Sequence, residues 1–384
     1  LLRAHSTSQL QPAQANGYQL TAALFLRLLA LIFFSAFASL AIQIEGLAGS
    51  QGILPVSEAL DKNLAYWGNT AFWHFPSLFW INSSDFMLIT TTYLGCLISI
   101  LFFFNILPRI SLIILLVLYL SLSYAGQIFM NFQWDTLLME AGFLALFLSP
   151  HSRYSIWLFR WLLFRLRFLS GISKLVTQDP SWSGLTAVVL YFEVQPLPNW
   201  LSWYAHQLPE WLLMSATALT LLIEIVVPFM MFLPRRYRFI AAWLTIALQV
   251  LIMLTSNHNW INLLTIALCL FLFDDQALER VVPIRLKSWL LSKPLPFNRE
   301  RKFYKPAMLI LGSFILFISS VQIYEMLIYQ RIEGRVGELK RQVQILRLVN
   351  QYHVFPTMKT ERLELLIYGS NDGQQWQEYL FKHK

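Results

Sequence analysis

Long apolar runs, each close to the length of a membrane-crossing helix, constrain this chain more than any other feature of its sequence. The hydrocarbon core of a bilayer requires about 20 consecutive, mostly apolar residues in a helix. A helix on the surface of a soluble domain instead repeats its apolar residues at a helical period. The runs therefore predict an α-helical polytopic membrane protein.

We predict about nine spans. They are Thr21–Gln43, Phe86–Asn105, Ile110–Met130, Asp135–Pro150, Tyr154–Val176, Leu212–Leu233, Phe239–Ser256, Trp260–Phe273 and Ala307–Tyr329. The fourth, seventh and eighth are shorter than a full span, and short helices with polar interruptions often border an internal site.

The charge content agrees with a membrane location. Only 13% of the residues are charged, against about 25% in soluble domains. The net charge is +8, but no nucleic-acid motif is present, so we expect membrane lipids and not nucleic acid as partners of the basic residues. Cys96 and Cys269 lie inside apolar runs and form no CxxC motif, which argues against a disulfide scaffold or a dithiol site.

The distribution of Lys and Arg predicts the orientation. Between Val176 and Pro234 there is neither Lys nor Arg, and loop 44–85 has only Lys62, whereas 280–305 carries eight basic residues. The positive-inside rule then places the N-terminus in the cytoplasm and the C-terminus outside it. We expect an N-terminal tail (1–20), a membrane domain (21–330) with two outer aromatic loops (44–85 and 177–211) and a basic inner loop (277–306), and an outer domain from residue 331 to 384.

The outer loops are rich in aromatic residues, and segment 179–211 contains four tryptophans and four prolines. An interfacial aromatic belt explains most single tryptophans. The same loops could also fold over the bundle and bind a client or ligand. The candidate residues for that role are Trp182, Glu193, Gln195, Trp203, Tyr204, His206 and Gln207.

The C-terminal region has strand-like patterns. Residues 343–353, 362–368 and 376–381 alternate, and Gly369–Gly373 is a turn signal. We expect the start of a small β-rich domain that is truncated at Lys384, because these strands are too few for a stable sheet.

Charged residues inside spans are costly and mark partners or wet cavities. The predicted intramembrane cluster is Gln133, Asp135, Glu140, Arg165, Arg167, Lys174 and Glu224. Asp135 also fits an N-cap. A structural ion-pair network and a functional site have equal weight, and Lys174 could pair with Asp179 or act as a base after its pKa is lowered. Lys174 and Glu140 are the catalytic candidates; no metal motif is present and we expect no cofactor.

Several segments together resemble the lipase maturation factor family. They are GLAGSQGILP (46–55), FQWDTLLMEAGFLALFLSP (132–150), LSGISKLVTQDPSW (169–182), EVQPLPNWLSWYAHQLP (193–209), and, in the tail, NQYHVFPTMKTER and YGSNDGQQWQEYLFKHK. The resemblance implies a membrane protein that assists the folding of secreted lipases and whose C-terminal domain faces the lumen. The chain resembles a bacterial-type member, which favours a bacterial inner membrane, or the endoplasmic reticulum membrane in a eukaryote.

A short segment, Gly171–Lys174 followed by Trp182, is also distantly similar to the membrane domain of vitamin K-dependent gamma-carboxylase. Two hypotheses follow. The first is a maturation factor for an exported client, such as a lipase. The alternative is a membrane enzyme that acts on a lipid- or quinone-type substrate in a polar cavity. A transporter ranks last, because the spans show no inverted repeat.

Overall fold

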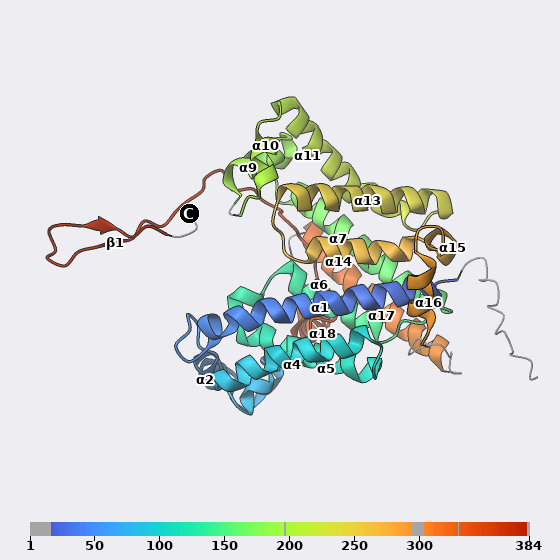
Figure 1. Cartoon of the computed structure of the whole chain (residues 1–384), viewed down its shortest axis with the longest axis horizontal. Helices are drawn as coiled ribbons and strands as arrows, with labels where there is room; N and C mark the ends of the chain where they lie inside the picture. The colour runs from blue at the N-terminus through green and yellow to red at the C-terminus, as the bar shows by residue number, and fades with distance from the viewer. Residues whose placement is uncertain (1–16, 196, 294–302, 329, 382–384) are drawn as a thin grey trace, which may run out of the picture.

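The computed structural model describes residues 17–195, 197–293, 303–328 and 330–381. It shows a bundle of helices with a C-terminal tail that extends away from it (Figure 1). Within these residues, five helices are long and apolar enough to cross a membrane: α1 (Gln19–Ala48), α4 (Asp85–Phe103), α5 (Pro108–Ala125), α13 (Arg235–Thr255) and α17 (Tyr304–Ile328). This confirms a helical, multi-pass membrane protein.

The number of spans differs from the prediction of nine. A sixth span is possible only if α10 (Trp200–His206) and α11 (Glu210–Ile225), which are bent by 110°, count as one. Pro228, in the first turn of α12 (Val227–Met230), helps to end α11 early.

Three further predicted spans form helices that are too short or too highly charged to cross a membrane. They are α6 (Gln133–Ala145), α7 (Arg153–Val176) and α14 (Ile261–Cys269) with the 3₁₀ turn Leu270–Leu272. α6 and α14 are too short, and α7 carries four arginines and a lysine. All three bury most of their residues, so neighbouring helices and not lipid surround them.

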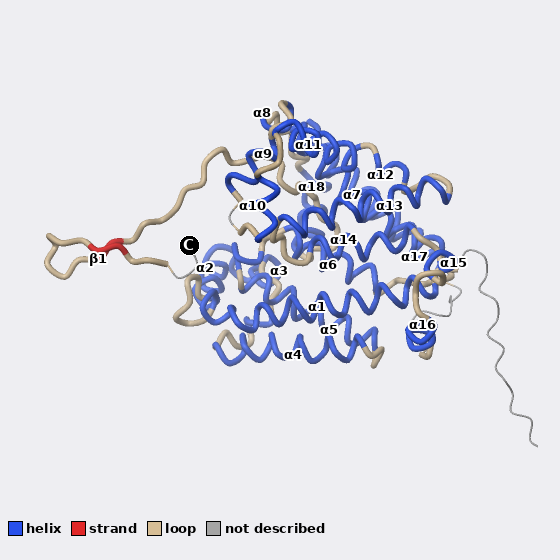
Figure 2. The backbone as a smooth tube through the Cα atoms, turned by 45° about the horizontal axis from the view of Figure 1, so that its top comes forward, coloured by secondary structure: helices blue, strands red, loops and turns tan. Residues whose placement is uncertain are grey.

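The bundle has two different ends (Figure 1). At one, which we call the basic end, lie α15 (Asp275–Leu278) and α16 (Ile284–Leu291), and Arg235 Nε donates to Asp274 Oδ2 at 2.6 Å. At the other, which we call the loop end, lie α2 (Val56–Trp67), α3 (Ala71–His74), α8 (Pro180–Ser183), α9 (Ala187–Val194) and α10 (Figures 1 and 2). The C-terminal tail leaves the bundle at the loop end.

The described part of the tail is not β-rich, contrary to the prediction. It begins with α18 (Gly334–Ile345), which includes part of the strand predicted over 343–353. The remaining strands are the two-residue β1 (Tyr368–Gly369) and β2 (Gln377–Glu378), paired antiparallel with Tyr368 opposite Glu378. Figure 2 shows that the rest of the tail is loop. Residues 349–358 are irregular because their backbone groups bind side chains of the bundle, as described below.

α1 and α4 approach each other closely at Gly95. A Cβ atom there would lie 2.2 Å from Cδ1 of Phe37. Small residues allow such close helix packing in membranes. We expect Gly95→Ala to destabilise the protein by about 1–3 kcal/mol, as overpacking does. Gly312→Ala is the matched control, because its Cβ would meet only Leu158 Cδ2, at 3.7 Å. Equal melting temperatures of both variants in detergent would contradict this packing.

Candidate functional site

A buried carboxylate, Glu140 on α6, is the centre of the main polar network. Its Oε1 pairs with Nη2 of Arg165 on α7, and both side chains are fully buried. Its Oε2 accepts three hydrogen bonds: from the backbone N–H of Asn350 at 3.0 Å, from Nδ2 of the same residue at 3.1 Å and from the hydroxyl of Tyr352 at 2.8 Å. Glu140 therefore joins the membrane bundle to the C-terminal tail.

Arg165 closes the same network from the opposite side. Its Nη1 donates to the backbone carbonyl of Asn350 at 3.2 Å, and its guanidinium lies 5.9 Å from the ring centre of Tyr352. Charge-assisted hydrogen bonds of this kind are stronger than neutral ones. The pair and the tail residues thus bind one another, and Arg165 Nε is the one atom of the guanidinium that has no hydrogen-bond partner among the described residues although it is buried.

A second network lies further along α7. Glu224 on α11 pairs with Arg167 Nη2 at 2.9 Å through Oε1 and with Lys174 Nζ at 2.7 Å through Oε2. Lys174 also donates to the carbonyls of Ser170 at 3.1 Å and Val354 at 2.6 Å. These three acceptors match the three N–H groups of the ammonium. Lys174 therefore binds Glu224 and the tail and does not pair with Asp179.

Residues 349–358, which we call the anchor segment, make further contacts with the bundle. Gln322 Nε2 donates to Val349 O at 3.0 Å, the N–H of His353 to Gln133 Oε1 at 3.2 Å and the N–H of Val354 to Ser170 Oγ at 3.3 Å. Buried backbone groups must find partners, and here bundle side chains supply them. The anchor segment thus occupies the place where the sequence predicts a polar cavity.

The C-terminal part of the anchor segment binds Thr177 and Asp179, just beyond the end of α7. Thr177 Oγ1 donates to Pro356 O at 2.8 Å, and the N–H of Met358 donates to Asp179 Oδ2 at 2.8 Å. Burial raises the pKa of Asp179, but hydrogen bonds from the Ser181 side chain and from backbone N–H groups outweigh this and hold the pKa below its usual value. The carboxylate therefore stays charged while it holds the tail.

The predicted polar cluster is consequently divided. Gln133, Glu140 and Arg165 meet one part of the anchor segment, and Arg167, Lys174 and Glu224 form the second network. Asp135 belongs to neither: it accepts a hydrogen bond from the Tyr119 hydroxyl at 2.5 Å and one from the Phe132 N–H at 3.3 Å. Asp135 is therefore not the N-cap that the sequence predicts: Phe132 is the N-cap of α6, and Asp135, at the third helical position, accepts from the backbone N–H of that residue.

The candidate binding residues of the outer loop separate by exposure. Trp182 and Gln195 are buried, and the Trp182 ring lies 4.9 Å from Lys174 Nζ. Trp203 and Tyr204 are about two-thirds exposed, and Glu193, His206 and Gln207 are also exposed. Trp182 therefore packs against the second network, whereas the buried Gln195 side chain has no hydrogen-bond partner among the described residues. The other five residues are available to a partner.

Sequence reasoning missed Asn350 and Tyr352, because their segment alternates like a strand. One signal could have found them. The charged residues predicted inside the spans need hydrogen-bond partners, and Asn350 and Tyr352 are polar residues close to the apolar Val349 and Val354. Among the described residues, no group of three or more His, Cys, Asp or Glu side chains could hold a metal ion.

The anchor segment also contacts a half-buried histidine, His258. Phe355 packs edge-on against His258, with ring centres 5.0 Å apart, and the Tyr191 hydroxyl lies 2.8 Å from His258 Nε2. Burial lowers the pKa of His258. Its neutral form is therefore favoured in the folded protein, and the unfolded chain binds more protons as the pH falls.

We expect His258 to make the protein less stable in acid. Its contribution is complete above about pH 6.5, the ordinary pKa of histidine, and is lost as the pH falls through the folded-state pKa. The melting temperature of the natural chain should fall more between pH 7.5 and pH 5.5 than that of His258→Asn. Identical pH responses of the two proteins would refute this role.

The comparisons with known proteins now decide the family. Residues 20–280 match the model of the lipase maturation factor transmembrane domain. The chain belongs to the lipase maturation factor family.

Relatives in the lipase maturation factor family match different shares of the chain. Lipase maturation factor 2 of Xenopus laevis is 41% identical over 67% of this chain and 40% of its own length, and the Homo sapiens protein is 38% identical over 68% and 41%. Lipase maturation factor 1 of Mus musculus is 30% identical over 96% of this chain and 69% of its own length. The chain spans about two fifths of the length of the lipase maturation factor 2 relatives that it matches.

No solved structure matches the chain. The likeness to the gamma-carboxylase membrane domain stays a prediction. The relatives named here are animal proteins, so they give no support to the bacterial inner membrane expected from the sequence.

Proposed function

We propose that this chain is a membrane-embedded maturation factor for exported proteins, with a secreted lipase as its client. The names of its relatives point to lipases. The observation that carries the proposal is the anchor segment, which is held by both buried charge networks through Glu140, Arg165 and Lys174. On this proposal the membrane domain is a rigid support for the tail.

The charged residues have their own partners within the chain, so their proposed role is structural. Within the described part of the tail, the exposed side chains of Trp203 and Tyr204 have no such partner. Trp203 and Tyr204 expose 63% and 60% of their surface and pack edge to face, with ring centres 5.2 Å apart. Aromatic side chains that are exposed in this way are suited to contacts with another protein.

We further propose that the basic end faces the cytoplasm and the loop end faces the lumen or the outside. The support is the position of Arg235, Arg238 and α16 at one end and of the tail at the other (Figure 1). The client would then meet the tail on the side to which it is exported. In a eukaryotic cell this location is the endoplasmic reticulum membrane.

Complementation tests the function. The natural chain is expressed in cells that lack their own lipase maturation factor and that produce a secreted lipase, and lipase activity in the medium is measured. We expect activity to be restored. No recovery, at a normal level of membrane-inserted chain, would refute the proposed function.

Two side-chain variants then test the proposed client surface. The double variant Trp203→Ala and Tyr204→Ala should lower secreted lipase activity about tenfold or more, because exposed aromatic anchors often contribute 2 kcal/mol or more to binding. The matched control is Tyr93→Ala, an exposed aromatic side chain on the span α4. Equal activity of the two variants at equal protein levels would contradict the assignment.

A further inference from the structure

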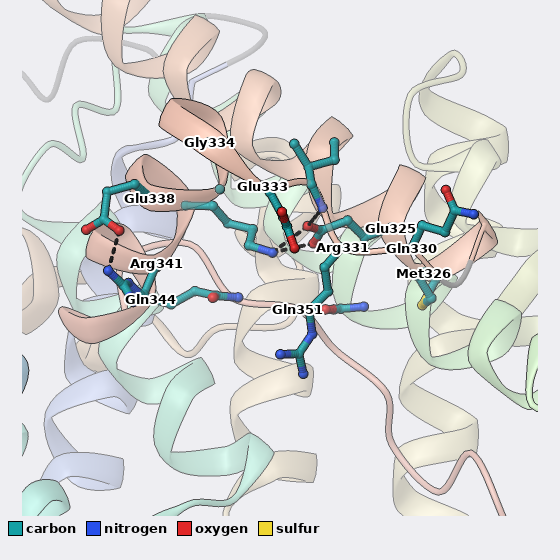
Figure 3. Close-up of a pocket in the computed structure, with 13 residues that line it drawn as sticks. Glu325, Met326, Gln330, Arg331, Glu333, Gly334, Glu338, Arg341, Gln344 and Gln351 are labelled. Atoms are coloured by element: carbon teal, nitrogen blue, oxygen red, sulfur yellow. Dashed lines mark hydrogen bonds and ion pairs between the residues drawn. The ribbon is translucent and has the colours of Figure 1, made fainter.

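A polar groove lies between the end of α17 and α18 (Figure 3). Its volume is about 700 Å³. Glu325 and Met326 line it from α17, whereas Glu338, Arg341 and Gln344 line it from α18. Gln351 of the anchor segment completes the lining, so the groove adjoins the buried Glu140 network.

The base of the groove is fixed by its own contacts. Lys340 Nζ lies 2.5 Å from Glu325 Oε2, and the N–H of Ile332 donates to Glu325 Oε1 at 2.8 Å. A Cβ atom at Gly337 would lie 2.1 Å from the carbonyl oxygen of Ile332. The groove is therefore a preformed feature that needs glycine at this position.

The upper lining has unused hydrogen-bonding capacity. In the part of the chain that the structure describes, the side chains of five lining residues make no hydrogen bond or ion pair: Gln330, Arg331, Glu333, Gln344 and Gln351. A carboxamide both donates and accepts hydrogen bonds, as a peptide group does. Each of the three carboxamides, Gln330, Gln344 and Gln351, can therefore bond one peptide group of a bound chain.

We propose that this groove binds an extended polar segment of the unfolded client polypeptide. This inference rests on the proposed function. Arg331 and Glu333 add one charge of each sign, and Met326 adds apolar contact. A lipid headgroup would use the charges but would leave the three carboxamides unmatched, and so the peptide fits the lining better.

A peptide bound in the groove would also affect the buried Glu140 network. Gln351 lies between Asn350 and Tyr352, which both donate to Glu140. A peptide that binds Gln351 therefore tightens the anchor segment, and release of that segment removes one wall of the groove. Client binding and tail docking are coupled in this arrangement.

Site-specific photocrosslinking tests the groove. The photoreactive residue p-benzoylphenylalanine replaces Gln344 in the full chain, in cells that produce the secreted lipase. The matched control is the same replacement at Gln342, which lies on α18 but binds Glu338 and does not line the groove. We expect a lipase adduct at position 344 that is several times stronger than at 342.

Equal or absent lipase adducts at position 344, or adducts with lipid alone, would overturn the groove proposal. If the natural chain still restores lipase activity in that case, the proposed function stands without the groove. If it does not restore activity, the proposed function itself fails.

As a second measurement, the double variant Gln344→Ala and Gln351→Ala should weaken lipase capture by about tenfold, the effect of losing two neutral hydrogen bonds. Unchanged capture by this variant would also overturn the proposal.

Discussion

Replacing Glu140 with glutamine is expected to lower the free energy of unfolding by about 3–5 kcal/mol, because it leaves the buried Arg165 without a counter-charge. The substitution also weakens the acceptor of the Asn350 and Tyr352 hydrogen bonds. The anchor segment should detach, and trypsin should then cleave faster at Lys359. Melting temperature in detergent and the cleavage rate measure the two effects.

An exposed carboxylate provides the matched control for this substitution. Glu338 pairs with Arg341, and both side chains are about half exposed. Exposed ion pairs contribute roughly 0–1 kcal/mol. Glu338→Gln should therefore leave both the melting temperature and the cleavage rate nearly unchanged. If Glu140→Gln behaved like Glu338→Gln, Glu140 would not hold the tail.

Replacing Glu224 with glutamine is expected to have an effect of similar size, about 3–5 kcal/mol. Glu224 is the carboxylate that both Arg167 and Lys174 contact, so its loss leaves two buried cations close together. The expected results are a lower melting temperature and less folded protein in the membrane.

A second substitution separates charge from packing. Adding Lys174→Met to Glu224→Gln removes one of the two unpaired cations, so the double variant should recover part of the lost stability. Single and double variants in contact are expected to be non-additive. If the two losses simply added, the three side chains would not act as one network.

The sequence predicts a helical membrane protein because a helix that crosses the hydrocarbon core of a bilayer needs a long apolar run. It does not show which helices face lipid. The run 154–176 is long enough, but its arginines and lysine require other helices around it, and α7 is accordingly buried. The shorter helices α6 and α14 are apolar because they pack against other helices of the protein and not because they face lipid.

The candidate site could be predicted in part. Glu140, Arg165, Arg167, Lys174 and Glu224 stand out as charges in apolar runs, and the structure brings each of them to a partner. The pairing itself depends on the rotation and depth of each helix, which a sequence pattern does not determine. Lys174 was a candidate partner of Asp179 and instead binds Glu224.

The tail shows why alternation alone is insufficient. Asn350 and Tyr352 stand two residues apart because both point into the bundle and bind Glu140, and not because they lie in a sheet. An extended segment that binds side chains has the same period as a strand. Only the described contacts with α6 and α7 distinguish the two.

The central claim is that the buried networks hold the tail in place for client maturation. The most direct measurement compares secreted lipase activity with tryptic release of the tail, for the natural chain, Glu140→Gln and Glu58→Gln at equal membrane levels. Glu58 lies on α2, outside the groove, and forms an exposed pair with Lys62. The account predicts that Glu140→Gln alone releases the tail and loses lipase activity. Full lipase activity from Glu140→Gln with a released tail would contradict it.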